Sequence, residues 1–383
     1  MAGGGAGRDA HDAHDDARDL RGATVSETRN YPGGGPMSVE EIEHELGSLR
    51  SDEDGQPGLR ASVLNLIVVT DDDSAERVTD EVARLAGRYP SRAILLISDP
   101  GDPEPALDVG LSVFCESRGG QESRVCAEQI TVHAGGATAG HLESIAGPLL
   151  IPDLPVFLLY PHGFDPTSPE LSGMVRLADR IIVDSAAAQH PGECLRSVAG
   201  MLREEDAPAF GDLQWVALSP WRSLLANLFE PPERAGMLRE VERVELRHAP
   251  DGMCRALLLV GWLADSLGWS LLSASETEGG REVRFEAPGG GEVAVGISES
   301  APPEEDLRRV RLYSGEWSFQ VSRHRERADA RTTVMRGGEL VGERTVHLGS
   351  LDLSVLVGEE LRYRGRDTAY EGAIRKATEV IDL

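Results

Sequence analysis

The stretch SVLNLIVVT, residues 62–70, decides the fold class of this chain. It is a nearly continuous apolar run rich in β-branched residues, which is typical of a parallel strand buried on both faces. A helix with an apolar stripe is predicted from Ser74 to Tyr89, and SRAILLIS, residues 91–98, has the composition of a second buried strand. Strand, helix and strand in this order predict a βαβ unit within a parallel sheet.

The same alternation continues through the middle of the chain. Two alternating strands at 106–117 and 123–134 are expected to form a hairpin at the edge of the sheet. Further elements follow in alternation: buried strands at 154–160 and 180–185, and helices at 138–150, 168–178 and 192–205. This pattern favours an open, doubly wound, mostly parallel α/β sheet.

The pattern changes near residue 236, which predicts a second domain. A strand is expected at 238–249 and a strongly apolar helix at 252–269, before a series of short strands and two C-terminal helices. The second domain is therefore predicted to be α+β with an antiparallel sheet. The predicted division is a disordered tail at 1–37, a short helix and linker at 38–58, a Rossmann-like α/β domain at 59–235 and the α+β domain at 236–383.

Composition excludes several classes of function. The 383 residues carry a net charge of −27 and are 40% apolar, enough for two cores. The negative charge of such a chain repels phosphate backbones and anionic lipid, so we expect no nucleic-acid or membrane partner. The same charge suits a protein partner with a basic patch. No apolar run approaches the about 20 residues of a membrane span, and no secretory leader is visible. A cytoplasmic protein is predicted.

Motifs of common enzyme classes are missing. The sequence has no G-x-S-x-G elbow, no H-E-x-x-H and no P-loop, and its four cysteines have no zinc-ligand spacing. The turn after the first strand reads VVTDDDSAERV, with three aspartates where a dinucleotide site needs glycine. We therefore expect neither a nicotinamide cofactor nor any other cofactor or metal.

One Gly-rich turn is a candidate for anion binding. In AGGATAGH, Gly135 and Gly136 precede Thr138, the predicted N-cap of a helix, and His141 lies nearby. Free amides at a helix N-terminus can hold a phosphate. An ordinary turn with an N-cap accounts for the same residues and is the preferred interpretation.

Other polar residues lie near strand ends, where open α/β sheets bind ligands. His133 and His162 have no paired acid or nucleophile in a motif, so structural roles are preferred. Asp184 and Ser185 end a buried strand, and we expect them to cap the following turn rather than face a ligand.

Cys115 and Cys126 lie on the two strands of the predicted hairpin. If they were cross-strand neighbours, a redox-controlled disulfide would become possible. Two small, buried, reduced side chains are the preferred interpretation.

The most distinctive stretch is DLQWVALSPWRSLLANLFEPP, residues 212–232. Ser219 and Pro220 predict a helix start, with serine as N-cap and proline at the first helical position. Trp215 is predicted to pack in the core at the domain junction. For Trp221 and Arg222 a core role and an anchor in a protein interface both stay open, because interface hot spots favour Trp and Arg.

Several segments together resemble a known family. They are RASVLNLIVVT, CAEQITV, GPLLIPDLPVFLLY, LADRIIVDS and the stretch from residue 212, in this order. The chain resembles the OpcA family of glucose-6-phosphate dehydrogenase assembly proteins over about residues 38–365. One departure lies after DLPV, where Phe157-Leu158-Leu159-Tyr160 replaces an expected pair of aromatics.

The resemblance implies a non-catalytic protein that binds glucose-6-phosphate dehydrogenase and promotes its assembly or allosteric activation. Trp215, Pro220, Trp221 and Arg222 are then the candidate contact residues. The alternatives are a sugar-phosphate-binding protein or enzyme that uses the 135–141 turn, and a remnant of an α/β enzyme with a different partner.

Overall fold

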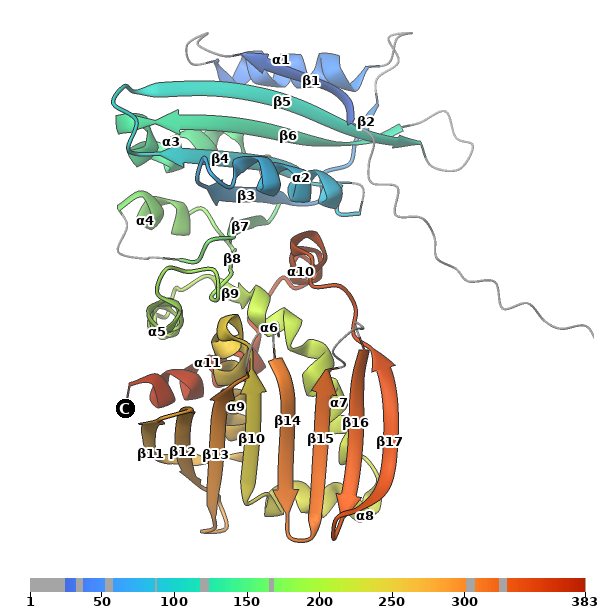
Figure 1. Cartoon of the computed structure of the whole chain (residues 1–383). Coiled ribbons are helices and arrows are strands. Elements are labelled where there is room, and N and C mark those ends of the chain that lie inside the picture. The colour runs from blue at the N-terminus through green and yellow to red at the C-terminus, as the bar shows by residue number, and fades with distance from the viewer. Residues whose placement is uncertain are drawn as a thin grey trace, which may run out of the picture.

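The computed structural model describes residues 25–31, 37–51, 58–86, 88–117, 124–164, 169–300, 307–323 and 329–382. Two large sheets lie at opposite ends of the molecule, with several helices between them (Figure 1). Within these residues, no helix combines the length and the apolar character that crossing a bilayer requires.

The N-terminal sheet confirms the predicted doubly wound α/β fold. Its parallel strands run in the order β6-β4-β3-β7-β8-β9. Counted along the chain, this order is 3-2-1-4-5-6, as in nucleotide-binding sheets. The strands are β3 (Asn65–Thr70), β4 (Arg92–Asp99), β6 (Arg124–Gly135), β7 (Val156–Tyr160), β8 (Arg180–Val183) and β9 (Ala209–Asp212). The four residues of β9 were not predicted.

Both faces of this sheet are buried, as the apolar strands predicted. Along β3, Ile67 packs into one core, while Leu66 and Val68 pack into the other. The helices α1 (Val39–Arg50), α3 (Leu142–Ala146), α4 (Pro169–Val175) and α5 (Pro191–Met201) cover the Ile67 side. The helices α2 (Ala75–Ala86), α6 (Leu213–Ala217) and α10 (Leu353–Glu360) cover the other.

The predicted hairpin is formed by β5 (Ala106–Ser117) and β6, in antiparallel register. It does not lie at the edge, because β1 (Val25–Tyr31) pairs with β5, and the short β2 (Leu59–Arg60) pairs with β6. The prediction that residues 1–37 form a disordered tail was therefore wrong for the residues of β1. The free main-chain groups of β5 offer it hydrogen bonds that composition does not reveal. Residues 1–24 and 32–36 and most of the linker, 52–57, lie outside the described residues.

Helix α1 confirms the predicted capping box. The Ser38 hydroxyl accepts from the Glu41 amide, and the Glu41 carboxylate accepts from the Ser38 amide. At its other end, Arg50 forms an ion pair with the buried Glu128 of β6. Glu128 also binds the buried Arg92 of β4 at 2.6 Å, so paired charges fix this helix on the sheet.

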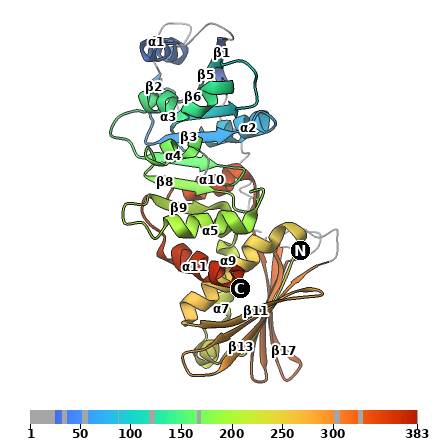
Figure 2. The ribbon, with the colours of Figure 1, turned by 90° about the vertical axis from the view of Figure 1, so that its left-hand side faces the viewer.

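The C-terminal sheet has the order β11-β12-β13-β10-β14-β15-β16-β17. It is antiparallel, as predicted, except for the parallel pair β10 and β13. Figure 2 shows α7 and α9 on one side of this sheet. The strands are β10 (Arg243–His248), β11 (Ser270–Thr277), β12 (Gly280–Glu286), β13 (Glu292–Glu299), β14 (Leu307–Ser314), β15 (Trp317–Arg323), β16 (Asp329–Arg336) and β17 (Glu339–His347), and the helices are α7 (Ser219–Leu228), α8 (Pro232–Ala235) and α9 (Met253–Leu267).

The chain finally returns to the first domain. Leu356, Val357 and Leu361, in and just after α10, belong to the α/β core beside α2, although the predicted boundary placed them in the second domain. Arg180 of β8 and Glu360 of α10 form a buried ion pair at 2.6 Å. The last helix, α11 (Thr368–Ile381), packs on α9 and α5 and so contacts both domains.

Candidate functional site: a cavity at the domain junction

Helices α6 and α7 carry the Trp-Pro-Trp-Arg stretch to the junction. Asp212 caps α6 by accepting a hydrogen bond from the Gln214 amide. Ser219 was predicted to cap α7, which is wrong: it is the first residue of that helix and follows Leu218. Leu218 is itself in the helical region, so one helix runs into the next and no side-chain cap forms. Pro220 is therefore the second residue of the helix, one position later than predicted, although still in its first turn.

A cavity of about 320 Å³ lies beside these helices. Its other walls come from the segment after β17, from α10 and from the start of α11. All four predicted contact residues line it. The lining residues are Trp215, Val216, Ala217, Ser219, Pro220, Trp221, Arg222, Arg323, Leu348, Gly349, Ser350, Leu351, Val355, Leu356, Glu359, Glu360, Tyr363 and Asp367.

Both tryptophans are core residues. Trp215 is 2% exposed, as predicted, and its indole N–H donates to Asp367 at 2.8 Å. It lies within α6, next to the Tyr370 ring. Trp221 is also 2% exposed and is among the largest fully buried side chains. A partner could therefore reach Trp221 only through the cavity.

Arg222 is the half-buried cation of the cavity. Its guanidinium lies 3.4 Å from the centre of the Trp215 ring, a cation–π contact. Nη2 donates to the Ser219 hydroxyl at 3.0 Å, the one hydrogen bond that this side chain makes within the described ranges. Its Nε is buried without a partner there. Burial lowers the pKa of Arg222 to about 10, against the pull of Asp367.

The carboxylates of the opposite wall are already engaged. Glu360 binds Arg180, and Glu359 binds Arg362. Asp367 accepts the indole N–H and also caps α11. Sequence reasoning missed this wall, because it lies some 150 residues from the tryptophans: Trp215 and Asp367 are 152 positions apart.

The edge where parallel strands end differs from a dinucleotide site. Asp71 accepts a hydrogen bond from the Ser74 amide at 2.8 Å and so occupies the start of α2. Between β3 and β7, where the strand order reverses, His162 Nε2 lies 3.1 Å from the Thr70 hydroxyl. Burial lowers the pKa of His162. His133 pairs with Asp72 at 3.3 Å. The Ser74 amide before α2 and the side chains at the switch point therefore already have protein partners.

The Gly-rich turn does not form the predicted anion site geometry. Residues Gly136–His141 are a 3₁₀ helix, so Thr138 lies inside it and caps nothing. A side chain on Gly135 would meet the Asp102 carboxylate, at 2.7 Å from its Cβ. This negative group disfavours a phosphate there. The turn contributes no residue to the lining of the cavity.

Asp184 caps its turn, as predicted, by accepting from the amides of Ala186 and Ala187. The neighbouring Asp212 is fully buried. Desolvation raises the pKa of Asp212 to about 7, although amides of Gln214 and Ser185 donate to it. No pattern in the sequence marked this carboxyl, because an N-cap aspartate is ordinarily exposed.

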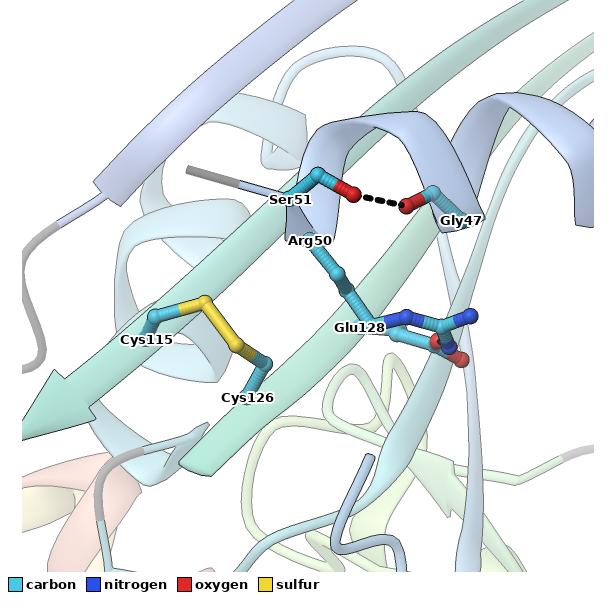
Figure 3. The surroundings of a disulfide bond; sticks show 6 residues. All are labelled: Gly47, Arg50, Ser51, Cys115, Cys126 and Glu128. Atoms are coloured by element: carbon cyan, nitrogen blue, oxygen red, sulfur yellow. Dashed lines mark hydrogen bonds and ion pairs between the residues drawn. A yellow bond between two sulfur atoms is a disulfide. The ribbon is translucent and has the colours of Figure 1, made fainter. Parts of the chain in front are cut away.

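Cys115 and Cys126 are direct cross-strand partners and form a disulfide (Figure 3). The preferred interpretation as two reduced thiols was therefore wrong. Figure 3 places the bond near the end of α1, where Arg50 points to Glu128. Cys194 and Cys254 are free and buried, and desolvation raises the pKa of each thiol to about 12, so neither is a ready nucleophile.

Metal binding finds no support among the residues that the structure places. They contain no group of three or more His, Cys, Asp or Glu side chains that could hold an ion.

Two family models match the chain in succession. Residues 82–200 match the OpcA model described as glucose-6-phosphate dehydrogenase subunit N-terminal domain, and residues 208–374 match the corresponding C-terminal domain. The chain belongs to the OpcA family. The cavity lies within the C-terminal match of this family. The disulfide lies within the N-terminal match, and the Asp71 turn precedes that match.

Curated members of the OpcA family are similar to this chain. A protein named putative OxPP cycle protein OpcA, from Synechocystis sp., is 26% identical over 317 residues, which are 78% of this chain and 65% of the relative. One of the same name from Nostoc punctiforme is 30% identical over 211 residues, 54% of this chain and 43% of the relative. The chain thus spans less than two thirds of the length of these relatives.

Some solved structures align with most of this chain. A levoglucosan dehydrogenase in complex with NADH and L-sorbose is 11% identical, with a TM-score of 0.49, over 84% of this chain and 96% of that one. A biliverdin reductase from Synechocystis sp. is 10% identical, with a TM-score of 0.47, over 84% of this chain and 99% of that one. No functional inference follows from these likenesses.

Proposed function

We propose that this chain is a non-catalytic accessory protein that binds glucose-6-phosphate dehydrogenase and promotes its assembly or allosteric activation. The observation that carries the proposal is the pair of consecutive family models, both described as domains of a glucose-6-phosphate dehydrogenase subunit. The curated relatives are named putative OxPP cycle proteins, which agrees with this proposal.

The chemistry of the α/β domain supports a role without catalysis. Nucleotide-type sheets bind a pyrophosphate on bare amides at the start of their first helix. Here Asp71 accepts a hydrogen bond from the Ser74 amide, directly before the first helix, and two further aspartates follow Asp71. The buried thiols have pKa values raised to about 12, and the cavity contains no nucleophile paired with a base.

The junction between the domains is the proposed region of contact. Pro220 and Arg222 line the cavity, and Tyr363, 56% exposed, lies on its opposite wall. An effect on the dehydrogenase requires that this surface bind its active state more tightly than the inactive one. A surface at a domain junction is suited to this, because both domains position it.

Complex formation and activation can be measured separately. The chain is mixed with purified glucose-6-phosphate dehydrogenase, the complex is assayed by size-exclusion chromatography with light scattering, and activity is assayed over a range of glucose 6-phosphate. We expect a complex and a change in kcat or KM. Tyr363→Glu is expected to weaken the complex, whereas Asp80→Asn, on the exposed side of α2, leaves it unchanged. Absence of both a complex and a kinetic effect refutes the proposal.

Catalysis by the chain itself has its own test. Isothermal titration with NADPH and NADP⁺ is expected to give no heat of binding. A dinucleotide that binds at residues 70–74 of the unchanged chain, and that still binds to the Asp71→Arg variant, would instead support a dehydrogenase.

A further inference from the structure

The cavity at the domain junction contains a cation that the protein does not neutralise by direct contact. Arg222 has five N–H donors, and within the described ranges its one hydrogen bond goes to the Ser219 hydroxyl. Burying a guanidinium without a carboxylate partner is unfavourable. The cation–π contact with Trp215 offsets part of this cost but leaves the donors unused.

The acidic groups around the cavity do not take up these donors. Glu359 and Glu360 are bound to other arginines, and Asp367 is occupied by Trp215 and by the amides of α11. Arg323 also lines the wall. The Arg222 donors thus have no carboxylate partner within the described ranges.

We propose that this cavity is a binding site for a small organic anion, a carboxylate or a phosphate ester, held by Arg222 and Ser219. The planar guanidinium can bind two oxygens of such a group at once. Its plane is fixed beforehand by Trp215, which reduces the entropy lost on binding. Ser219 accepts from Arg222 and can donate its own hydroxyl hydrogen to the ligand.

The dimensions and the remaining lining fit a ligand of this class. About 320 Å³ lies at the small end of the range for small-molecule pockets. Leu348, Leu351 and Val355 offer an apolar wall for the body of the ligand, and Ser350 is a polar group of the lining. The site goes beyond the proposed function, since it requires no partner protein.

Isothermal titration and thermal shift of the full chain test the site. The probes are 6-phosphogluconate, glucose 6-phosphate, gluconate and inorganic phosphate, with glucose as the neutral control. Comparison of gluconate with glucose 6-phosphate shows whether the site recognises a carboxylate or a phosphate group. We expect at least one anion to bind saturably and raise Tm, and glucose to have no effect. Arg222→Gln should weaken binding by roughly tenfold or more, because it removes a charge-assisted contact.

Two further variants separate ligand binding from folding. Gly349→Glu adds a carboxylate to the wall at a position where a Cβ meets no atom within 4 Å, so it should abolish binding while the fold is kept. Arg176→Gln, at an exposed position just after α4, should bind like the unchanged chain. The proposal is overturned if no anion binds, or if Arg222→Gln and Gly349→Glu bind the anion as tightly as the unchanged chain does. Either result leaves the test of complex formation with the dehydrogenase unaffected.

Discussion

Replacement of Asp212 by asparagine should change how the stability of the chain depends on pH. Asp212 is fully buried, and its Oδ2 has no hydrogen-bond partner among the described residues. Desolvation raises its pKa from 3.8 to about 7. The folded chain therefore holds a proton that the unfolded chain releases. Asparagine imitates the protonated carboxyl at every pH.

The direction in which the free energy of unfolding changes with pH follows from proton linkage. Between the two pKa values the folded state binds more protons, so the free energy of unfolding falls as pH rises. The slope is about 1.4 kcal/mol per pH unit, and over the roughly three units between 3.8 and 7 the loss amounts to about 4 kcal/mol. This stability is fully present below pH 4 and is lost by the time pH passes 7.

Urea unfolding at several values from pH 4.5 to pH 8, followed by tryptophan fluorescence, measures the effect. We expect Asp212→Asn to be more stable than the unchanged chain by up to about 4 kcal/mol at pH 8, with the difference shrinking towards pH 4.5. Asp80→Asn, an exposed position on α2, is the control and should give curves parallel to the unchanged chain. A difference between Asp212→Asn and the unchanged chain that stays constant with pH would contradict the reasoning.

Three other perturbations have expected outcomes. Glu360→Gln leaves the buried Arg180 charge without its carboxylate and should lower the free energy of unfolding by about 3–5 kcal/mol. The double variant with Glu360→Leu and Arg180→Met should lose much less, because it removes both charges. Equal losses in urea unfolding would refute this. Reduction of the bond between Cys115 and Cys126 opens a loop of 11 residues and should lower the free energy of unfolding by about 2–3 kcal/mol. Unfolding with and without dithiothreitol measures this loss. The double variant with Cys115→Ser and Cys126→Ser is the control and should not respond to the reductant. Gly261→Ala places a Cβ 2.0 Å from a backbone oxygen of α11 and should lower Tm by several degrees in calorimetry, whereas Gly236→Ala, with open space around it, should not.

The sequence predicted most of the fold because strand and helix periodicity is a local property. The apolar runs of β3, β4 and β7 are buried on both faces, and the alternating runs of β5 and β6 pair as a hairpin. The capping box of α1 was also visible, since Ser38 and Glu41 lie three positions apart. Strand β1 was missed, because its pairing depends on an edge supplied by β5 and not on its own composition.

The site was predicted in part. The sequence singled out Trp215, Pro220, Trp221 and Arg222, and the structure places all four around one cavity. Which of them a ligand or partner could touch depended on burial, and Trp215 is covered by Tyr370 and Asp367, which lie far along the chain.

The sequence by itself determined the two-sheet architecture, the family and the absence of a glycine-rich phosphate turn, all of which depend on residues close together in the chain. Only the tertiary structure decided that Asp367 meets Trp215, that Glu360 neutralises Arg180 and that Asp212 is sealed from water. These contacts join groups 152 and 180 positions apart or depend on a whole packed layer. Local periodicity carries no information about which distant side chains meet, because that is fixed by how the two domains pack against the returning C-terminal helices.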